Sequence, residues 1–390
     1  MKYWKNSLKQ PNNQMKIGFD AKRLFFNRTG LGNYSRTLVR NLIKYHPENL
    51  YFLYTPKIVK NNPFFKEFSS YNNVKILPVK GIFPGISRSL FLHKQLEEKQ
   101  PDVYHGLSNE IPLFSMPSKI RYAVTVHDLI FKHYPDTYPL ADRMIYDFKF
   151  KRSCERADKI IAISHATKND IVKFYQIPEE KIEVVYQSCD DVFYQPLDFN
   201  KTRIGKDKYQ LPANYLLFVG SIQERKNLQL ILQAYPLLKP DFQLPLVIVG
   251  KGEKFKKKLQ PLIRKNNLET KLIWLDKVSD NEELKHIYTG AEMLIYPSLY
   301  EGFGLPVAEA LLCKTAVITS DVSSLPEAGG PGALYISPHS KEELAAAIEK
   351  LAANENFKKE LAEKGFEYAI EKFSPQTTTS HIYRIYQQIV

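Results

Sequence analysis

Short apolar runs recur along almost the whole chain and alternate with longer amphipathic stretches. The runs are continuous and rich in β-branched and aromatic residues, which is typical of parallel strands covered by helices on both faces. The stretch 35–45 between two runs shows helical spacing instead, because Leu38, Leu42 and Tyr45 fall on one face. The pattern predicts an α/β fold of parallel, doubly wound sheets. Strands are expected at 16–21, 51–55, 74–79, 102–107, 122–128, 159–164, 181–187, 215–220, 244–250, 271–276, 293–298, 315–321 and 333–337.

The strands form two series separated by the polar stretch 190–213, which contains two prolines. At 390 residues the chain exceeds the size at which a single core usually stops growing. We therefore predict two Rossmann-like domains that face each other across a cleft lined by strand-to-helix loops, since ligands bind at the carboxyl ends of parallel strands. The predicted limits are 1–198 for the N-terminal domain, with 1–14 a polar extension, and 199–375 for the C-terminal domain, with a helix at 376–390 packing back on the first.

The formal net charge of +13 is concentrated in the first 100 residues, which hold 18 lysines and arginines against 5 acidic residues. Such a region attracts anionic membranes or phosphorylated ligands, although an ordinary solvated basic face is the alternative. No nucleic-acid-binding motif accompanies the charge, so nucleic acid is not an expected partner. The three cysteines (Cys154, Cys189 and Cys313) lack metal or disulfide spacing, which suits a reducing compartment. With neither a signal sequence nor a membrane span in the pattern, we expect a cytoplasmic protein with peripheral contact at the inner membrane face.

Two loops in the first half carry candidate binding residues. In the loop 27–36, Gly30 and Gly32 precede a helix and would let backbone amides approach an anion, although an ordinary tight turn is equally compatible with them. His127 and Asp128 end an apolar strand and would meet a polar ligand there. A histidine satisfied within the structure is the alternative for His127.

A third loop follows the strand 215–220, which ends in Gly220 and Ser221. Arg225 and Lys226 come next, and Asn227 is predicted to be the N-cap of the following helix. Two adjacent cations beyond a strand end are well placed for a diphosphate, since arginine offers a fork of donors and lysine a point charge. A solvated basic turn is the alternative.

The fourth loop contains two acids on either side of a glycine-rich turn. Pro306 suits the first turn of a helix, and Gly302 and Gly304 would let the preceding backbone bend its amides toward an anion. Glu301 precedes this turn and Glu309 lies about one turn inside the helix. Acids beside a phosphate site are useful if they bind hydroxyl groups, as in a sugar or ribose. Helix capping is the alternative for Glu309.

These motifs resemble, in the same order, those of the family-4 retaining glycosyltransferases with the GT-B fold, group 1, and in particular its mannosyltransferase-like members. The stretch PSLYEGFGLPVAEAL is similar to the E-x7-E motif of that family, and the resemblance covers most of residues 15–390. The other similar stretches are TGLGNYSR, VTVHDL, IIAISHATKNDI, VGSIQERKN, VGKGE and ITSDVSSLPEAGG.

The resemblance implies roles for individual residues. Arg225 and Lys226 would contact the donor diphosphate, Glu301 and His127 the transferred sugar, and Glu309 the ribose hydroxyls, whereas 250–252 and the neighbourhood of Val278 would face the base. The catalytic residues implied are His127, Arg225, Lys226 and Glu301. The donor-binding residues implied are Gly30, Gly32, Gly220, Ser221, Gly250, Lys251, Val278, Gly302, Phe303, Gly304, Leu305 and Glu309. No cofactor and no metal site are expected, and the sequence shows no Asp-x-Asp motif at a strand end.

The expected activity is transfer of a hexose, with mannose from GDP-mannose as the first choice, to a hydroxyl of a glycan or lipid-linked acceptor in cell-surface polysaccharide synthesis. We expect retention through same-face attack, in which the leaving phosphate takes the acceptor proton, rather than through a covalent Glu301 intermediate. The alternatives are a UDP-sugar donor, a nucleotide-sugar epimerase or phosphorylase on the same fold, and a binding protein without turnover.

Overall fold

The computed structural model describes residues 14–79, 84–113, 117, 119–278 and 280–390. Its strands form a seven-stranded sheet in the order β3-β2-β1-β4-β5-β6-β7 and a six-stranded sheet in the order β10-β9-β8-β11-β12-β13. The strands are β1 Lys16–Asp20, β2 Leu50–Thr55, β3 Val74–Pro78, β4 Val103–Gly106, β5 Arg121–Val126, β6 Lys159–Ala162, β7 Ile182–Val184, β8 Leu216–Val219, β9 Leu246–Val249, β10 Leu272–Leu275, β11 Met293–Tyr296, β12 Ala316–Ser320 and β13 Ala333–Ile336. Every strand predicted from the sequence is confirmed, and the α/β fold class with it.

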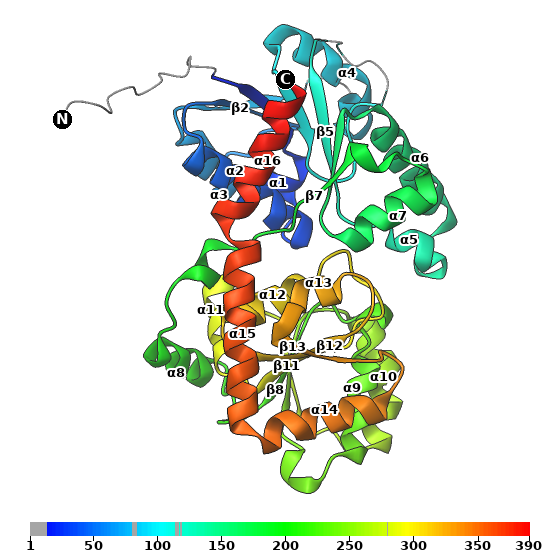
Figure 1. Cartoon of the computed structure of the whole chain (residues 1–390), viewed down its shortest axis with the longest axis vertical. Helices are drawn as coiled ribbons and strands as arrows, with labels where there is room; N and C mark the ends of the chain where they lie inside the picture. Colours follow the sequence, from blue (N-terminus) through cyan, green and yellow to red (C-terminus); the bar gives the residue numbers. More distant parts are fainter. Residues whose placement is uncertain (1–13, 80–83, 114–116, 118, 279) are drawn as a thin grey trace, which may run out of the picture. The chain divides into compact units, whose positions relative to one another are not determined.

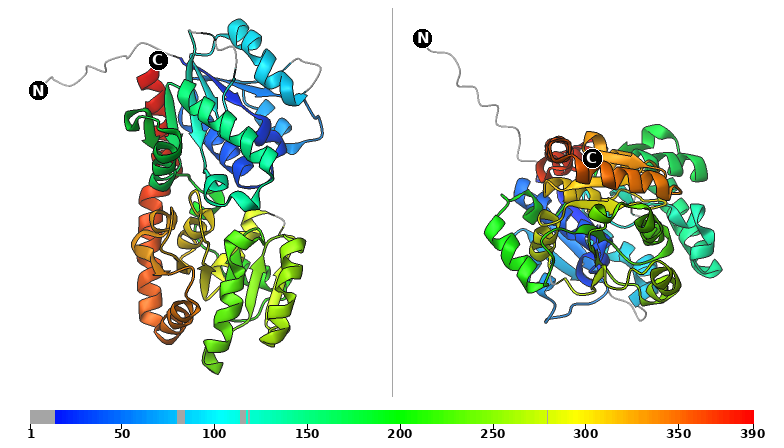
Figure 2. Two further views of the ribbon diagram at one scale, coloured as in Figure 1. Left: turned by 90° about the vertical axis from the view of Figure 1, so that its right-hand side faces the viewer. Right: turned by 90° about the horizontal axis from the view of Figure 1, so that it is seen from below.

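Helices connect the strands and cover both faces of each sheet (Figures 1 and 2). Pro375–Ile389 confirms the helix predicted at the end of the chain. The helices are α1 Lys22–Phe26, α2 Gly30–Tyr45, α3 Pro63–Ser69, α4 Pro84–Lys99, α5 Ile130–His133, α6 Leu140–Arg156, α7 His165–Tyr175, α8 Phe199–Lys208, α9 Leu228–Ala234, α10 Glu253–Lys265, α11 Asn281–Thr289, α12 Leu305–Leu312, α13 Leu325–Gly329, α14 Lys341–Ala353, α15 Glu355–Phe373 and α16 Pro375–Ile389.

The six-stranded sheet explains why its strands are apolar throughout. Leu216 and Phe218 of β8 pack into one core with α9, α10 and α14, whereas Leu217 and Val219 pack into a second core with α11 and α12. Because successive strand residues point to opposite faces, burial of both faces requires a continuous apolar run. The parallel pairs β8/β9, β8/β11 and β11/β12 set the register of the central strands.

The chain divides into two compact units that do not follow the two strand series. One unit comprises Met1–Thr125, Asp147–Ile160 and Tyr383–Val390, and the other comprises Val126–Tyr146 and Ile161–Ile382. The domain limits 1–198 and 199–375, and the cleft expected between the domains, stay predictions.

The last two turns of α16 belong to the first unit. There the buried Tyr386 hydroxyl lies 2.6 Å from Nδ1 of His105 on β4, and the Tyr383 ring stacks on His46 at 3.6 Å. These contacts hold the end of the chain on the seven-stranded sheet.

The strand order reverses beside β8, which has β9 on one side and β11 on the other. At such a point the loops that follow the two neighbouring strands diverge and leave room for a ligand at their carboxyl ends. The loop after β8 carries Arg225 and Lys226, and the loop after β11 carries Glu301. The fold therefore brings these three residues of the second unit to one sheet edge.

Candidate active site

Glu301 forms the centre of a buried ionic cluster. Its Oε1 lies 2.6 Å from Lys226 Nζ and 2.9 Å from an Arg225 guanidinium nitrogen. The same oxygen accepts hydrogen bonds from Ser298 Oγ at 2.5 Å and from the Tyr296 hydroxyl at 3.1 Å. Because the Glu301 residue is only 7% exposed, these contacts act with little screening by solvent. The sequence predicted all three ionic residues at this site but not that they pair with one another.

The cluster fixes the charge states of its members. Burial alone would raise the pKa of the Glu301 carboxyl, but Lys226 and Arg225 outweigh burial and lower that pKa to about 2. Burial lowers the pKa of the Lys226 ammonium more than Glu301 raises it. For Arg225 burial alone would lower the pKa, but the combined effects of Glu301, Tyr296 and Asp128 outweigh burial and raise that pKa. The result is a fixed carboxylate beside a permanent guanidinium and a more easily deprotonated ammonium.

The backbone between Glu301 and α12 takes its shape from two different glycines. Gly304 has φ +114°, a left-handed conformation that side chains rarely adopt, and it precedes Leu305 at the start of α12. Gly302 does not bend the chain in this way. A Cβ on Gly302 would lie 2.2 Å from the carbonyl oxygen of His127, so Gly302 is required by close packing. Pro306 occupies the first turn of α12, as predicted.

Neighbouring side chains restrict which atoms of this loop face outward. Phe303 is buried and its ring stacks on Tyr186 at 5.7 Å and meets Phe373 edge-on at 5.2 Å. Leu305 packs against the same core. Only the backbone amides of these two residues remain for an anion, and their role in donor binding stays a prediction.

Glu309 differs sharply from Glu301 in its surroundings. Its carboxylate accepts a hydrogen bond from the buried Tyr288 hydroxyl at 2.9 Å. Burial raises the pKa of Glu309 to about 7, against the opposing effect of the Tyr288 hydrogen bond. One acid of the motif is therefore ionised at every physiological pH, whereas the other titrates close to neutrality.

His127 lies beneath the same loop and is buried. Its Nδ1 lies 3.0 Å from the Gln187 amide nitrogen. Because that nitrogen can only donate, Nδ1 accepts and the ring proton is assigned to Nε2. The carbonyl oxygen of His127 accepts from Thr167 Oγ1 at 3.2 Å. Asp128 follows, and burial raises the pKa of its carboxyl although Ile130 N–H and Arg225 lower it.

The remaining donor-site candidates of the second unit lie in loops that are hydrogen-bonded to one another. Gly220 N–H donates to the Val249 carbonyl at 2.9 Å, and Gly250 N–H donates to the Leu275 carbonyl at 3.2 Å. Ser221 and Lys251 in these loops are exposed. Val278, after β10, is partly buried against the core. The structure thus gathers these candidates at the carboxyl ends of β8, β9 and β10.

Two predictions about loop geometry need correction. Gly30 and Gly32 lie in the first turn of α2 and not in a loop before a helix. A Cβ on Gly32 would lie 1.8 Å from the Asn27 carbonyl oxygen, so packing requires this glycine. Both glycines belong to the first unit, and their contact with a donor stays a prediction.

The second correction concerns Asn227. It occupies the N-cap position of α9, but with φ +57° and without a side-chain cap. Its amide instead donates to the carbonyls of Pro297 and Pro338 at 3.0 and 2.8 Å. Asn227 therefore joins the loop after β8 to the loops after β11 and β13.

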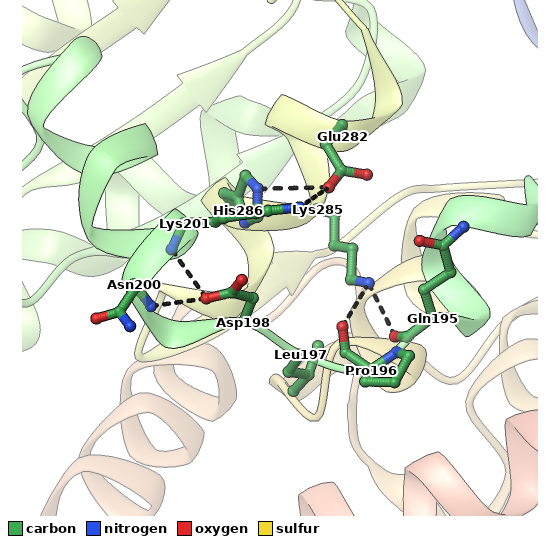
Figure 3. Close-up of a pocket in the computed structure, with 9 residues that line it drawn as sticks. All are labelled: Gln195, Pro196, Leu197, Asp198, Asn200, Lys201, Glu282, Lys285 and His286. Atoms are coloured by element: carbon green, nitrogen blue, oxygen red, sulfur yellow. Dashed lines mark hydrogen bonds and ion pairs between the residues drawn. The ribbon is translucent and has the colours of Figure 1, made fainter.

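A pocket of about 430 Å³ elsewhere in the second unit has a different character (Figure 3). The buried Lys285 ammonium at its edge donates to the carbonyls of Val192, Gln195 and Pro196, at 2.9, 2.8 and 3.2 Å. Since backbone carbonyls accept all three hydrogen bonds of this ammonium, Lys285 holds the segment between β7 and α8 against α11 and has a structural role.

Sequence reasoning missed three residues that support the site. His133, Asp170 and Tyr300 are joined by hydrogen bonds and ring stacking next to Glu301. The position of Tyr300 beside Glu301 was the one signal available. Nothing in the sequence connects that tyrosine with a histidine and an aspartate of earlier segments.

The two Rossmann-like sheets and the ionic cluster at the reversal of strand order fit a glycosyltransferase of the GT-B class, and family models assign the chain to that class. The model of the family "Glycosyltransferase Family 4" matches residues 29–192, and that of "Glycosyl transferases group 1" matches residues 201–368. The chain belongs to these group 1, family-4 glycosyltransferases and is similar to their mannosyltransferase members.

Individual relatives agree with this assignment. The chain is 28% identical over 388 residues to O-antigen chain mannosyltransferase B of Escherichia coli, with 96% of this chain and 100% of that protein covered. It is 30% identical over 237 residues to O-antigen chain mannosyltransferase RfbU of Salmonella typhimurium, with 61% of this chain and 62% of that protein covered. Among solved structures, Anabaena Alr3699/HepE in complex with UDP and glucose superposes with a TM-score of 0.75 at 16% identity, with 96% and 100% of the two chains covered.

Proposed function

We propose that this glycosyltransferase moves a hexose, with mannose from GDP-mannose as the first choice, to a hydroxyl of a glycan acceptor in cell-surface polysaccharide synthesis, and that the acceptor is lipid-linked. The observation that carries the proposal is the buried cluster in which Arg225 and Lys226 meet Glu301 at 2.9 and 2.6 Å. The names of the E. coli and Salmonella relatives support mannose and O-antigen-type polysaccharide.

The cluster suits departure of a nucleoside diphosphate. When the bond from the anomeric carbon to the diphosphate oxygen breaks, negative charge develops on the leaving group and positive charge on the sugar. Arg225, Lys226 and the amides at the start of α12 would stabilise the leaving charge from positions that are already fixed. Glu301 and His127 would hold the sugar hydroxyls, and Glu309 those of the ribose.

We further propose a metal-independent, retaining reaction in which the acceptor hydroxyl attacks the face that the diphosphate leaves. The new bond joins the acceptor oxygen to the anomeric carbon, and the acceptor proton moves to the leaving phosphate oxygen. The low pKa of about 2 supports this route over a covalent Glu301 adduct, because a weakly basic carboxylate held by two cations is a poor nucleophile. Detection of a glycosyl–Glu301 peptide by mass spectrometry would reverse this assignment.

The first experiment is a thermal-shift screen of the purified protein against GDP-mannose, UDP-glucose, UDP-galactose, UDP-N-acetylglucosamine and ADP-glucose. A donor that binds the folded state raises the apparent melting temperature. The largest shift is expected with GDP-mannose, and Lys226→Met should abolish it. A larger shift with a UDP-sugar would select the alternative donor class, whereas no shift with any donor, together with no binding by calorimetry, would refute the proposal.

Product analysis separates transfer from the other activities that the fold can support. The donor chosen by the screen is incubated with and without a lipid-linked oligosaccharide, and the products are examined by NMR. Transfer with retained anomeric configuration is expected only with acceptor. Formation of an epimer without acceptor would indicate an epimerase, and sugar phosphate formed with added phosphate would indicate a phosphorylase.

We also propose contact with anionic membranes through the basic first 100 residues. No helix in the described part of the chain is long and apolar enough to span a bilayer. Co-sedimentation with phosphatidylglycerol vesicles but not phosphatidylcholine vesicles, weakened by salt, is expected. Equal binding to both vesicle types would contradict the electrostatic part.

A further inference from the structure

Asp170, on α7, binds two aromatic partners with its two carboxylate oxygens. Oδ2 accepts a hydrogen bond from the Tyr300 hydroxyl at 2.5 Å, and Oδ1 lies 2.8 Å from His133 Nε2. The rings of His133 and Tyr300 also stack on each other, with centroids 4.3 Å apart and planes at 27°. Asp170 is 6% exposed, so its carboxylate is largely shielded from water, whereas the His133 side chain is 24% exposed. Each of the three side chains, Asp170, His133 and Tyr300, therefore contacts the other two.

Tyr300 connects these three side chains to the ionic cluster around Glu301. Its backbone carbonyl accepts a hydrogen bond from the Arg225 guanidinium, and Glu301 is the next residue. The preceding residue, Leu299, donates its N–H to the Arg225 carbonyl at 2.8 Å and accepts from the Tyr134 hydroxyl at 3.3 Å. A displacement of Tyr300 would therefore move both a cation and the carboxylate of the cluster.

The other side of Glu301 is tied to the same helix. Ser164, the N-cap of α7, donates from Oγ to the Gly302 carbonyl at 2.7 Å, and Thr167 Oγ1 lies 3.3 Å from that carbonyl. Asp170 therefore holds Tyr300, and Ser164 with Thr167 holds Gly302. The residue between these two attachments is Glu301, which thus has α7 as its rigid support.

We propose that Asp170, His133 and Tyr300 act as a positioning triad, which holds Glu301 and Arg225 in the geometry needed for diphosphate departure without touching the substrate. The predicted changes in kcat and KM rest on the proposed function, because they assume that the protein transfers a sugar from a nucleotide donor. A purely structural polar network is the competing explanation, and it predicts loss of stability without a selective loss of turnover. Since catalysis depends on how precisely charges are placed, a loosened support should lower kcat more than it weakens donor binding.

Tyr300→Phe tests the triad because it removes one hydroxyl and retains the ring that stacks on His133. Tyr235→Phe is the matched control, since the Tyr235 hydroxyl is also buried and donates one hydrogen bond, to the Leu244 carbonyl at 2.8 Å. Loss of a hydrogen bond to an ionised group, such as that from Tyr300 to Asp170, corresponds to roughly a ten- to hundredfold effect, and loss of a neutral one to about tenfold or less. We expect Tyr300→Phe to lower kcat about tenfold with donor KM changed less than about twofold, and Tyr235→Phe to leave both unchanged.

Asp170 provides the rescue experiment. Asp170→Asn retains an oxygen that accepts from Tyr300 and gains an amide that can donate to His133 Nε2 once the ring proton moves to Nδ1, whereas Asp170→Ala offers neither bond. We expect Asp170→Asn to stay within about threefold of the native kcat and Asp170→Ala to lose more than about tenfold, by the same hydrogen-bond arithmetic. Equal kcat in Tyr300→Phe and Tyr235→Phe, or no difference between the two Asp170 variants, would overturn the triad.

A double-mutant cycle distinguishes failure of the triad from failure of the proposed function, because it needs no substrate. Melting temperatures are measured for Asp170→Ala, Glu301→Gln and the double variant. If the triad holds Glu301 in place, the double variant loses less than the sum of the two single losses, because Tyr300 couples Asp170 to Glu301. Additive losses would overturn the triad whatever the protein transfers. Absence of transfer by the native protein with every donor would refute the proposed function and leave this cycle to decide the triad alone.

Discussion

Replacement of Glu301 by glutamine should show how strongly the ionic cluster contributes to stability. The variant retains the size of the side chain but leaves Arg225 and Lys226 buried without their counterion. The carboxyl has an ordinary pKa of 4.5 and a pKa of about 2 in the folded protein. This difference corresponds to a contribution of about 3 kcal/mol to the free energy of unfolding. For a unit of this size, that loss lowers the melting temperature by roughly 6 to 12 °C.

The dependence on pH identifies the source of this stability. Because the folded state lowers the pKa of Glu301, its contribution is fully present above pH 4.5 and disappears as the pH falls toward about 2. Urea unfolding of the native protein and of Glu301→Gln should therefore give free energies that differ by about 3 kcal/mol at pH 7 and converge below pH 3.

Glu363→Gln provides the control for the loss of an ordinary ion pair. Glu363 lies 2.8 Å from Lys314 Nζ, but both side chains are exposed, with 53% and 38% of their surface accessible. Such pairs contribute about 0 to 1 kcal/mol. Equal losses in Glu301→Gln and Glu363→Gln at pH 7, or a difference for Glu301→Gln that does not shrink in acid, would refute the reasoning about the buried cluster.

Three further predictions test other parts of the site. Lys226→Met should lower transfer at least about a hundredfold in steady-state assays, while the melting temperature changes little because Arg225 still pairs with Glu301 and the cost of burying the Lys226 ammonium is removed; unchanged turnover would remove Lys226 from the mechanism. Donor affinity measured by calorimetry should increase from pH 6 to pH 8 as Glu309, with a pKa of about 7, becomes ionised, and a Glu309→Gln variant that retains this pH dependence would exclude Glu309 as its cause. Gly302→Ala should lower the melting temperature strongly, since its Cβ would lie 2.2 Å from the His127 carbonyl oxygen, and a native-like melting temperature would show that the loop can shift freely.

The strands and the main charged residues of the site follow from local sequence properties. The run at β8 is continuously apolar because Leu216 and Leu217 face different cores, as expected for a strand covered on both faces. Arg225 and Glu301 were identifiable because each lies shortly after such a strand, where parallel sheets place their ligands. This part of the site depends on the positions of the strands and on the composition of the loops that follow them, and short segments of sequence are enough to predict both.

What the sequence left open are the contacts between distant segments. Lys226 and Glu301 are 75 residues apart, and Asp170 and Tyr300 are 130 residues apart. The apolar pattern shows that each residue follows a strand or lies on a helix, but not which side chain it meets. Asn227 illustrates the same limit. Its preference for helix N-caps is a local propensity, and two carbonyls of neighbouring loops override that propensity in the fold.

The two acids of the E-x7-E motif also show why spacing alone does not assign chemistry. Their spacing suggests a similar pair, yet Glu301 meets two cations, whereas Glu309 meets the Tyr288 hydroxyl in a buried setting. The first acid is consequently a fixed charge whose position matters more than its protonation. For this reason Tyr300, which holds Glu301 in position, is expected to affect the rate of transfer. The second acid changes charge near neutral pH, so its contribution to donor binding depends on the medium. One motif therefore separates a permanent electrostatic element from a titratable one, and substitutions at the two positions should differ in pH dependence even where they reduce activity equally.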